Sequence, residues 1–348
     1  MLNFVSQARS KTLSEAVSET QNNDFPVLIP MQLQNNRYLI SIASEGLPQE
    51  FAFDPFLFLR QEHLQTQAED ERIIFQLLDH KSNKIAAHLP FFLDGKGLAY
   101  SPGKAPFGSV QFKKRLPEDV LAEFLLQTKR YLSAQKNCHT IRIKSYPFAY
   151  APQESAVLTD LLLKQHFRLS HSEINHHITV SEAPFETKLH PSARRRLHKC
   201  LKHGFTFQEE EVNLLPEVFH FIRDCRLERH YEAPMPLEKL AGLFHDFPQD
   251  FRIFSVRQQH ELAAATVAVR INGQTLYNFY PANPLRFNAF SPVVYLTEGL
   301  YEVCQRENFK TLDLGTSNLP AGPNFPLITF KKHLGGEPTL KLSFEFNA

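Results

Sequence analysis

The sequence predicts a mixed α/β protein built from two similar halves, and three observations lead to this prediction. The chain has 348 residues, about twice the usual length of a single domain. Strand-like and helix-like segments alternate from Pro26 onward. Each half shows strands, a helix, a strand, a second helix and a last strand, and this order repeats although the sequence does not. We therefore expect two mixed α/β units that meet near residue 180.

The composition is that of a globular protein with a sizeable core. Hydrophobic residues make up 43% and charged residues 22% of the chain, which excludes a mainly disordered, collagen-like or coiled-coil protein. The net charge of +1 provides no global field that would attract nucleic acid or a membrane. Any anion must therefore be bound by a local patch.

The spacing of the cysteines and the hydropathy of the sequence indicate the cellular compartment of the protein. The four cysteines are far apart and form no CxxC pair, which favours a reducing environment. The N-terminal sequence MLNFVSQARSKTLSEAVSETQ lacks the continuous apolar core of a signal peptide. No segment approaches the run of about 18 apolar residues that a membrane-spanning helix needs. We expect a cytoplasmic protein.

In the first half, a polar and loosely held segment of residues 1–25 precedes the folded part. Residues 71–81 and 85–93 have the composition of neighbouring strands, and turn residues at 82–83 join them. Apolar residues at a spacing near 3.6 predict a helix over 117–136, with a proline close to its start. The other elements expected here are a Pro- and Gly-rich loop (101–108), a strand (140–145), a helix (155–166) and a closing strand (177–180).

The second half repeats this order. A helix over 192–203 has a strong stop signal at Gly204. Strands over 263–271 and 274–280 are joined by the hairpin pair Asn272-Gly273. The other elements expected here are helices (214–230, 236–247, 292–308, 327–334) and strands (251–256, 311–314, 340–346).

Three segments are candidates for chemistry, and the first is the basic stretch 188–203. It holds six Lys or Arg and three His, and no acid occurs between Glu186 and Glu209. Ser192 is the expected N-cap, and Arg194 shares one helix face with His198 and Lys202. The stretch is either a docking face for phosphates or another polyanion, or an ordinary solvated face. The residues assigned to the anion in the first reading are Arg194, Arg195 and Lys199.

The second segment, 283–294, lies between a strand and a helix. Ser291 followed by Pro292 predicts a helix start, and a helix N-terminus offers N–H donors to an anion. Arg286 and Asn288 stand just before it and are further candidates for phosphate binding. The segment has no glycine, so its backbone cannot curl around a pyrophosphate as a glycine-rich loop does. An ordinary capped helix is the alternative.

The third segment is 313–336. Asp313 and Gly315 sit at the end of a strand, where α/β folds tend to place functional groups. A short helix with Lys331 follows. This lysine could stabilise a developing oxyanion or phosphate charge, and Asp313 could orient a group or accept a proton. The alternative is a connecting loop with Lys331 on the surface.

Several common motifs are absent. The sequence contains no HExxH and no Cys/His pattern with the spacing of metal ligands. It also lacks GxSxG, GxxxxGK[ST] and GxGxxG, which argues against a hydrolase elbow, a P-loop and a Rossmann dinucleotide site.

Two of the candidate segments resemble sequences of the Fem-like, tandem GNAT-fold acyltransferases. Asp313-Leu314-Gly315, Gly322, Phe330-Lys331 and Gly335-Gly336, followed by a last strand, are similar to the C-terminal end of that family. The helix PSARRRLHKCLKHGF is similar to the helix that opens the family's second domain. SPGKAPFG and the elements after it are similar to the first domain, so the resemblance covers roughly residues 45–346.

The resemblance implies two tandem GNAT-like domains, each a central mixed sheet flanked by helices, over residues 26–180 and 181–348. The second would carry the active site, with Lys331 in it and Asp313 on the neighbouring strand. The implied reaction moves an acyl or aminoacyl group from acyl-CoA or aminoacyl-tRNA to an amine on a small molecule or a cell-wall-precursor-like acceptor. No tightly bound cofactor is expected. The usual GNAT pyrophosphate loop, Q/R-x-x-G-x-G/A, would fall near 282–292 and is missing, so the donor stays open.

The leading hypothesis is therefore an N-acyltransferase. Lys331 would stabilise the carbonyl oxyanion, the helix start at Ser291 would lie near the donor phosphate, and Tyr280 or Asp313 would be the base. A first alternative is a non-catalytic module that keeps the fold and binds an anionic ligand or partner. A second is an RNA-binding protein that uses residues 194–202.

Overall fold

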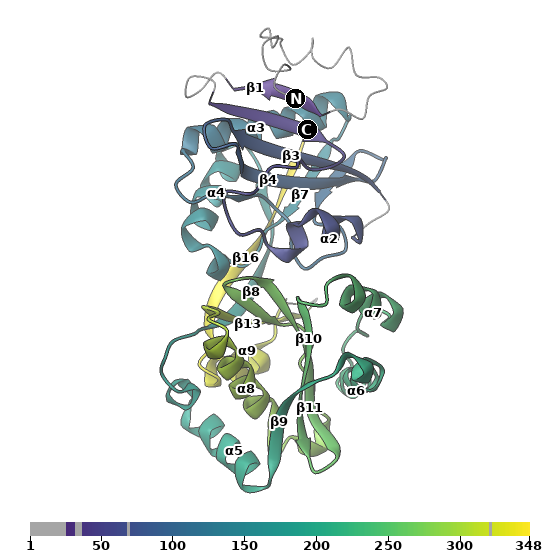
Figure 1. Ribbon diagram of the computed structural model, residues 1–348, viewed down its shortest axis with the longest axis vertical. Coiled ribbons are helices and arrows are strands. Elements are labelled where there is room, and N and C mark those ends of the chain that lie inside the picture. Colours follow the sequence, from purple (N-terminus) through teal and green to yellow (C-terminus); the bar gives the residue numbers. More distant parts are fainter. Residues whose placement is uncertain (1–25, 32–36, 68–69, 320–321) are drawn as a thin grey trace. The chain divides into compact units, whose positions relative to one another are not determined.

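The computed structural model describes residues 26–31, 37–67, 70–319 and 322–348 (Figure 1). The polar segment expected over 1–25 lies outside these residues. The chain divides into two units, the first ending at Ser172 and also containing Lys341–Ala348, the second spanning Glu173–Leu340. The division differs from the expected boundary after residue 180, because the chain passes from one unit to the other inside two long strands. These are β8 (Arg168–Thr179) and β16 (Glu337–Asn347).

The first unit is a mixed sheet with helices. Its strands follow the order β1-β2-β3-β4-β5-β7-β16, with β6 beside β4. Neighbouring strands are antiparallel except β5 and β7, which are parallel. The elements are β1 (Val27–Pro30), β2 (Tyr38–Ala43), α2 (Gln61–Gln65), β3 (Glu71–Asp79), β4 (Lys84–Leu93), β5 (Leu98–Ser101), β6 (Gln111–Phe112), α3 (Glu118–Gln135), β7 (Thr140–Lys144) and α4 (Pro152–Lys164).

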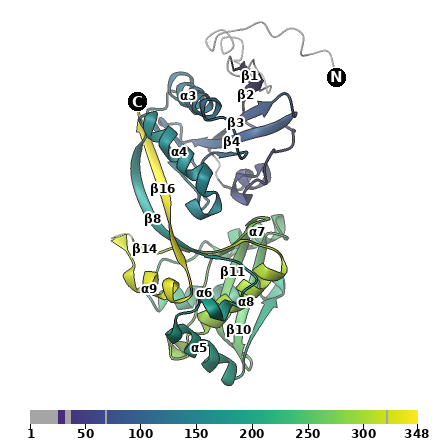
Figure 2. The same ribbon diagram turned by 90° about the vertical axis from the view of Figure 1, so that its left-hand side faces the viewer.

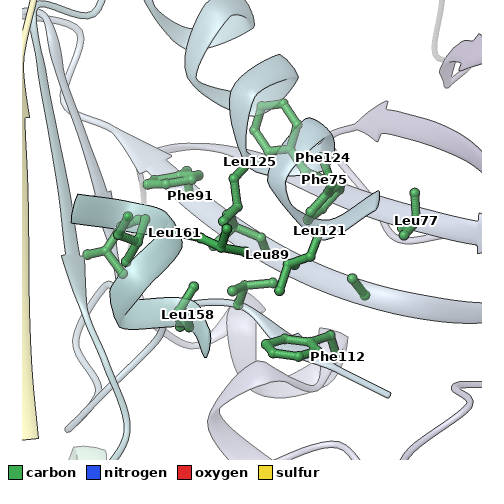
Figure 3. Packing of buried hydrophobic residues seen from close by; sticks show 14 of the residues in the cluster. Phe75, Leu77, Leu89, Phe91, Phe112, Leu121, Phe124, Leu125, Leu158 and Leu161 are labelled. Carbon is green, nitrogen blue, oxygen red and sulfur yellow. The ribbon is translucent and has the colours of Figure 1, made fainter. Parts of the chain in front are cut away.

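The predicted strands β3 and β4 and the predicted helices α3 and α4 are confirmed. In the turn between the strands, Asn83 has a φ of 52°, a conformation that asparagine tolerates better than most residues. Figure 3 shows why the helices form where they do, since Leu89 and Phe91 of the sheet face Leu125 of α3 and Leu161 of α4. β1, β2 and β5 were not expected from the sequence.

The second unit has a sheet in the order β8-β13-β12-β11-β10-β9. The pair β12–β13 is parallel and the other pairs are antiparallel. Helix α8 contacts β9, β10, β11 and β13 and also packs on α5, whereas α6 contacts β11 and α7 contacts β10. In Figure 1, α5 and α8 lie on one side of these strands and α6 and α7 on the other. The elements are α5 (Pro191–Lys202), β9 (Phe205–Glu210), α6 (Leu215–Leu227), α7 (Leu237–Asp246), β10 (Phe251–Gln258), β11 (Glu261–Asn272), β12 (Thr275–Asn278), α8 (Pro292–Arg306), β13 (Thr311–Thr316), β14 (Asn318–Leu319), β15 (Gly322–Pro323) and α9 (Phe325–His333).

The ends of α5 show one error and one success of the sequence prediction. The helix begins one residue earlier than expected, because Pro191 takes the first helical position with its fixed φ. The N-cap is His190, whose Nδ1 accepts a hydrogen bond from the backbone N–H of Ser192, so the prediction of Ser192 as N-cap is wrong. Gly204, with a φ of 70°, ends the helix as predicted.

Each unit therefore contains a strand, a crossover helix and a parallel strand, which are β5, α3 and β7 in the first unit and β12, α8 and β13 in the second. This confirms the predicted mixed α/β class with two similar units. No helix in the described ranges combines the length and the hydropathy required to cross a bilayer.

In the first unit, the loop after β5 closes the carboxyl end of the parallel pair. The backbone N–H of Gly108 donates to the carbonyl oxygen of Lys144 at 2.9 Å, at the end of β7. The N–H of Ser109 donates to the Oγ of Ser101 at 3.0 Å, at the end of β5. A Cβ on Gly108 would lie 2.6 Å from the backbone nitrogen of Pro102, so only glycine fits.

We expect Gly108→Ala to lower the free energy of unfolding by about 1–3 kcal/mol, the usual cost of overpacking a tight site. Chemical denaturation followed by circular dichroism measures the change. Gly242→Ala in α7 is the matched control, because a Cβ there meets nothing within 4 Å. It should raise the free energy of unfolding by roughly 0.5–1 kcal/mol through helix propensity. Equal effects of the two substitutions would contradict the close packing around Gly108.

Candidate functional site

In the second unit, the parallel strands β12 and β13 diverge at their carboxyl ends. Their register ends with Tyr277 opposite Asp313. Beyond this point the chain after β12 stays beside β11, where the N–H groups of Phe279 and Tyr280 both donate to the carbonyl oxygen of Val267, at 3.0 and 3.2 Å. A point where neighbouring strands lead in different directions is where α/β sheets commonly bind ligands.

β13 continues along β8 instead, and polar side chains gather there. The register shifts between Asp313 and Gly315, which places Gly315 opposite His176 and Thr316 opposite Asn175. Asp313 is only 1% exposed, and its Oδ1 accepts hydrogen bonds from the Asn175 amide at 2.7 Å and the Gly315 N–H at 2.8 Å. Gly315 has a φ of 75°, which favours glycine at this bulge.

Helix α9 carries Lys331 to the end of β13. The side chain is 6% exposed, and its Nζ donates to the carbonyl oxygens of Gly315 and Thr316, both at 2.8 Å. Burial lowers the pKa of Lys331 to about 7, and the charge of nearby Asp313 opposes this shift. Lys331 therefore changes its charge near neutral pH.

Two tyrosines lie at the same end of the strands. The Tyr280 oxygen accepts a hydrogen bond from the backbone N–H of Met235 at 3.3 Å, and its ring stacks on Phe279 with centroids 4.0 Å apart. Tyr277 places its hydroxyl 3.3 Å from the position that a Cβ on Gly315 would take. Burial raises the pKa of both phenols, so both keep their protons at neutral pH.

Sequence reasoning missed Tyr277 and His176. His176 is fully buried, and its Nδ1 lies 3.1 Å from the Oγ of Ser317. Burial and then the charge of Lys331 lower the pKa of His176 to about 4, so the ring is neutral. Only the pairing of β12, β13 and β8 places Tyr277 opposite Asp313 and His176 opposite Gly315, and no local sequence motif predicts that pairing.

The loop expected to bind a donor phosphate is held by other groups of the protein. Arg286 forms an ion pair with Glu261. The Asn288 side-chain oxygen accepts a hydrogen bond from Arg229 Nη2 at 3.3 Å. Ser291 is buried with a φ of 56°, and its side chain makes no capping hydrogen bond to α8. A phosphate at this loop would have to displace or share these contacts.

The three cations of α5 predicted to bind an anion differ in their surroundings. Arg194 Nη2 donates to the carbonyl oxygen of Glu186 at 2.9 Å, and its Nε lies 3.5 Å from that residue's carboxylate. Lys199 Nζ donates to the carbonyl oxygen of Ala289 at 3.1 Å, so α5 lies against the loop before α8. Arg195 is exposed.

The structure thus brings part of the predicted set together. Lys331, Asp313 and Tyr280 all lie at the carboxyl ends of β12 and β13. The residues predicted to bind an anion lie along α5 and the loop before α8. Among the described residues, no group of three or more His, Cys, Asp or Glu is arranged to hold a metal ion.

The burial of Lys331 predicts a pH dependence of stability that Lys331→Met removes. Its pKa is 10.5 in the unfolded chain and about 7 in the folded protein. Between these values the unfolded chain binds more protons, so the free energy of unfolding rises with pH, by up to about 1.4 kcal/mol per pH unit. Below about pH 7 the lysine is charged in both states and contributes no slope.

Urea titrations of both proteins at pH 6, 7, 8 and 9 measure this difference. The wild-type curve should rise relative to the Lys331→Met curve above pH 7. Parallel curves would contradict a desolvated lysine.

Comparison with known proteins identifies the second unit. Residues 188–325 match the model of the acetyltransferase (GNAT) domain, which covers α5 to the start of α9 and includes Asp313 and Tyr280. No curated protein sequence matches the chain.

Solved structures extend the similarity over both units. The crystal structure of FemX has a TM-score of 0.66 at 12% identity, covering 85% of this chain and 93% of FemX. The C-terminal domain of a putative lysylphosphatidylglycerol synthetase from Agrobacterium fabrum has a TM-score of 0.51 at 12% identity, covering 77% and 83%. A conserved protein of unknown function from Bacteroides thetaiotaomicron also has a TM-score of 0.51, at 10% identity, covering 83% and 91%. The second unit therefore carries a GNAT domain over residues 188–325, and the chain has the Fem-like fold with two GNAT-like units in tandem.

Proposed function

We propose that the second unit transfers an acyl or aminoacyl group from an activated donor to an amine. Acyl transfer in general is supported by the GNAT domain. The observation that carries the proposal is the buried Lys331, held by the carbonyl oxygens of Gly315 and Thr316 beside Asp313, at the point where β12 and β13 part. Perturbed ionisable groups at such a point are typical of active sites.

The chemistry needs an unprotonated amine, a stabilised oxyanion and a proton for the leaving group. The ammonium form of Lys331 has three N–H groups, and two of them bind the β13 carbonyls, so one remains for the oxyanion. Tyr280 accepts from Met235 and keeps its own proton, which suits a donor better than a base. Asp313 is then the better candidate for the proton acceptor.

The proposed donors are acyl-CoA, as a co-substrate, and aminoacyl-tRNA, and the proposed acceptor is a small-molecule or cell-wall-precursor-like amine. Both donors carry phosphates, and the exposed cations of α5, among them Arg195 and Lys199, could bind these in either case.

One observation favours the alternative of a non-catalytic module that binds an anionic ligand or partner. The loop before α8 has no glycine, and Arg286 and Asn288 are bound to Glu261 and Arg229. A module of this kind would keep its ligand affinity when Lys331 is neutralised.

Thermal unfolding with CoA and acetyl-CoA, at low and moderate salt, tests the donor. A ligand at about 100 times its Kd adds roughly 2.7 kcal/mol, which raises the midpoint by several degrees. Mass spectrometry of an amine mixture incubated with acetyl-CoA or with aminoacyl-tRNA then detects the product. We expect product with one of the two donors, and its absence with both would favour the binding module.

We expect Lys331→Met to lower the rate of transfer by about 10²-fold or more, as the loss of an oxyanion donor does in other enzymes. Lys239→Met on the exposed face of α7 is the matched control and should leave the rate unchanged. Circular dichroism verifies that both variants are folded. A folded Lys331→Met protein with wild-type turnover would contradict the assigned role.

A further inference from the structure

An apolar groove lies between the start of α6 and the length of α7 in the second unit. Its volume is about 660 Å³. Buried Leu215 and Phe244 line it together with Val212, which is 54% exposed. Apolar side chains that stay exposed in a hollow are typical of interaction sites. We call this hollow the α6–α7 groove, and its lining includes Val212, Leu215, Leu237, Glu238 and Phe244.

The α6–α7 groove is long and open. Most of its lining residues are exposed, among them Pro216, Ala241 and Pro248. A site for a small molecule encloses most of its ligand, which an open groove does not do. The ten residues of α7 span about 15 Å, the length of nearly three helical turns. The shape therefore favours a helix as the occupant, since an amphipathic helix can lay its apolar side chains into such a groove.

The walls of the α6–α7 groove are acidic. Residues 209–250, which contain α6 and α7, hold ten Asp or Glu but only four Lys or Arg, and none of these four cations lines the groove. Glu238 lines the groove and Glu211 directly precedes Val212. Both acids are exposed, and within the described residues neither forms an ion pair. His245 also lines the groove, but a histidine of ordinary pKa carries a full charge only below neutral pH. The groove therefore favours a cationic occupant.

Helix α5 presents a complementary surface. Arg195 and Lys202 are seven residues apart, which places them on one face of the helix. Both are exposed, and in the part of the chain that the structure describes neither is bound by an acid or a carbonyl oxygen. Leu201, next to Lys202, is 49% exposed. The twelve residues of α5 span about 18 Å, so the helix has the length, the charge and an apolar side chain that suit the α6–α7 groove.

The α6–α7 groove and the α5 helix of one chain cannot meet. Helix α5 packs on α8 on one side of the strands, and α6 and α7 pack on the other side. Figure 1 and Figure 2 show α5 and α7 at opposite ends of the second unit. An α5 helix that fills the groove must therefore come from a second copy. Such a contact joins two different surfaces, so it leaves one groove and one α5 helix free in a pair of copies.

We propose that α5 of one copy docks into the α6–α7 groove of a second copy. Leu201 contacts the apolar lining, and Arg195 and Lys202 lie beside Glu238 and Glu211. Because these charges are exposed at the surface, salt weakens the contact. Docking would also cover cations of α5 that the proposed function assigns to the donor phosphates, so association and donor binding would exclude each other; this consequence alone rests on the proposed function.

A mixture of two variants tests the contact. Glu211→Lys with Glu238→Lys blocks the groove and leaves α5 intact, whereas Arg195→Gln with Leu201→Gln and Lys202→Gln does the reverse. In sedimentation velocity at low salt we expect the native chain to associate as its concentration rises, and each variant alone to associate at least tenfold more weakly. An equal mixture of the two should form a dimer and nothing larger, because only one intact α5 and one intact groove remain in each pair.

Glu45→Lys with Glu62→Lys is the matched control for the groove variant. Both residues are exposed in the first unit, and the pair of substitutions changes the net charge by the same amount. This control should associate as the native chain does. Circular dichroism verifies that all variants are folded. Sedimentation needs no substrate, so failure of the transferase proposal would leave the result readable.

Three outcomes would overturn the proposal. The first is a native chain that stays monomeric at low salt; binding of a labelled peptide of residues 191–204 to that monomer would then assign the groove to a basic helix of another protein. The second is self-association that the groove variant leaves unchanged. The third is a mixture that associates no better than its components, which would show that the copies meet through another surface.

Discussion

The desolvation of one cation determines the geometry of the second unit's site. A lysine amine in the interior must be hydrogen-bonded or lose its charge, since an unpaired buried charge is prohibitively costly. Lys331 meets this constraint with the carbonyl oxygens of Gly315 and Thr316, which are available because β13 is irregular at Asp313. The same irregularity turns the Gly315 N–H toward Asp313. The lysine, the bulge and the carboxylate therefore form one interdependent arrangement.

The two units share one arrangement of a strand, a crossover helix and a parallel strand, but different groups lie at the carboxyl ends of their parallel strands. In the first, the end of the parallel pair is closed by the chain itself, since Gly108 and Ser109 bond to the ends of both strands. In the second, ionisable and phenolic side chains occupy the corresponding position, among them Lys331 and Tyr280. A position closed by backbone hydrogen bonds cannot admit a substrate without losing them. This contrast supports assigning the proposed reaction to the second unit.

Local patterns account for what could be predicted. The strands β3 and β4, the helix α3 and the stop at Gly204 follow from turn residues, 3.6-residue spacing and a left-handed glycine. The elements and site residues that the sequence did not predict depend on contacts between distant segments. The short strand β5 depends on its partners β4 and β7, and only strand pairing places Tyr277 opposite Asp313 and His176 opposite Gly315. The burial of Lys331 is invisible beside Lys332, because two adjacent lysines look like a surface pair in the sequence.

A net charge of +1 conceals a separation of charge within the second unit. On α5, His198 and Arg194 face the Glu186 carboxylate, at 2.8 and 3.5 Å, and this acid offsets the charge of Arg194. Arg196 and Lys199 donate to the carbonyl oxygens of Asn288 and Ala289, and Lys199 also lies over the Phe290 ring. A carbonyl dipole orients a cation without cancelling its charge, so this side of α5 keeps its positive potential while it holds the loop before α8 in place. One set of contacts therefore holds the loop in place and would also serve the proposed binding of an anion.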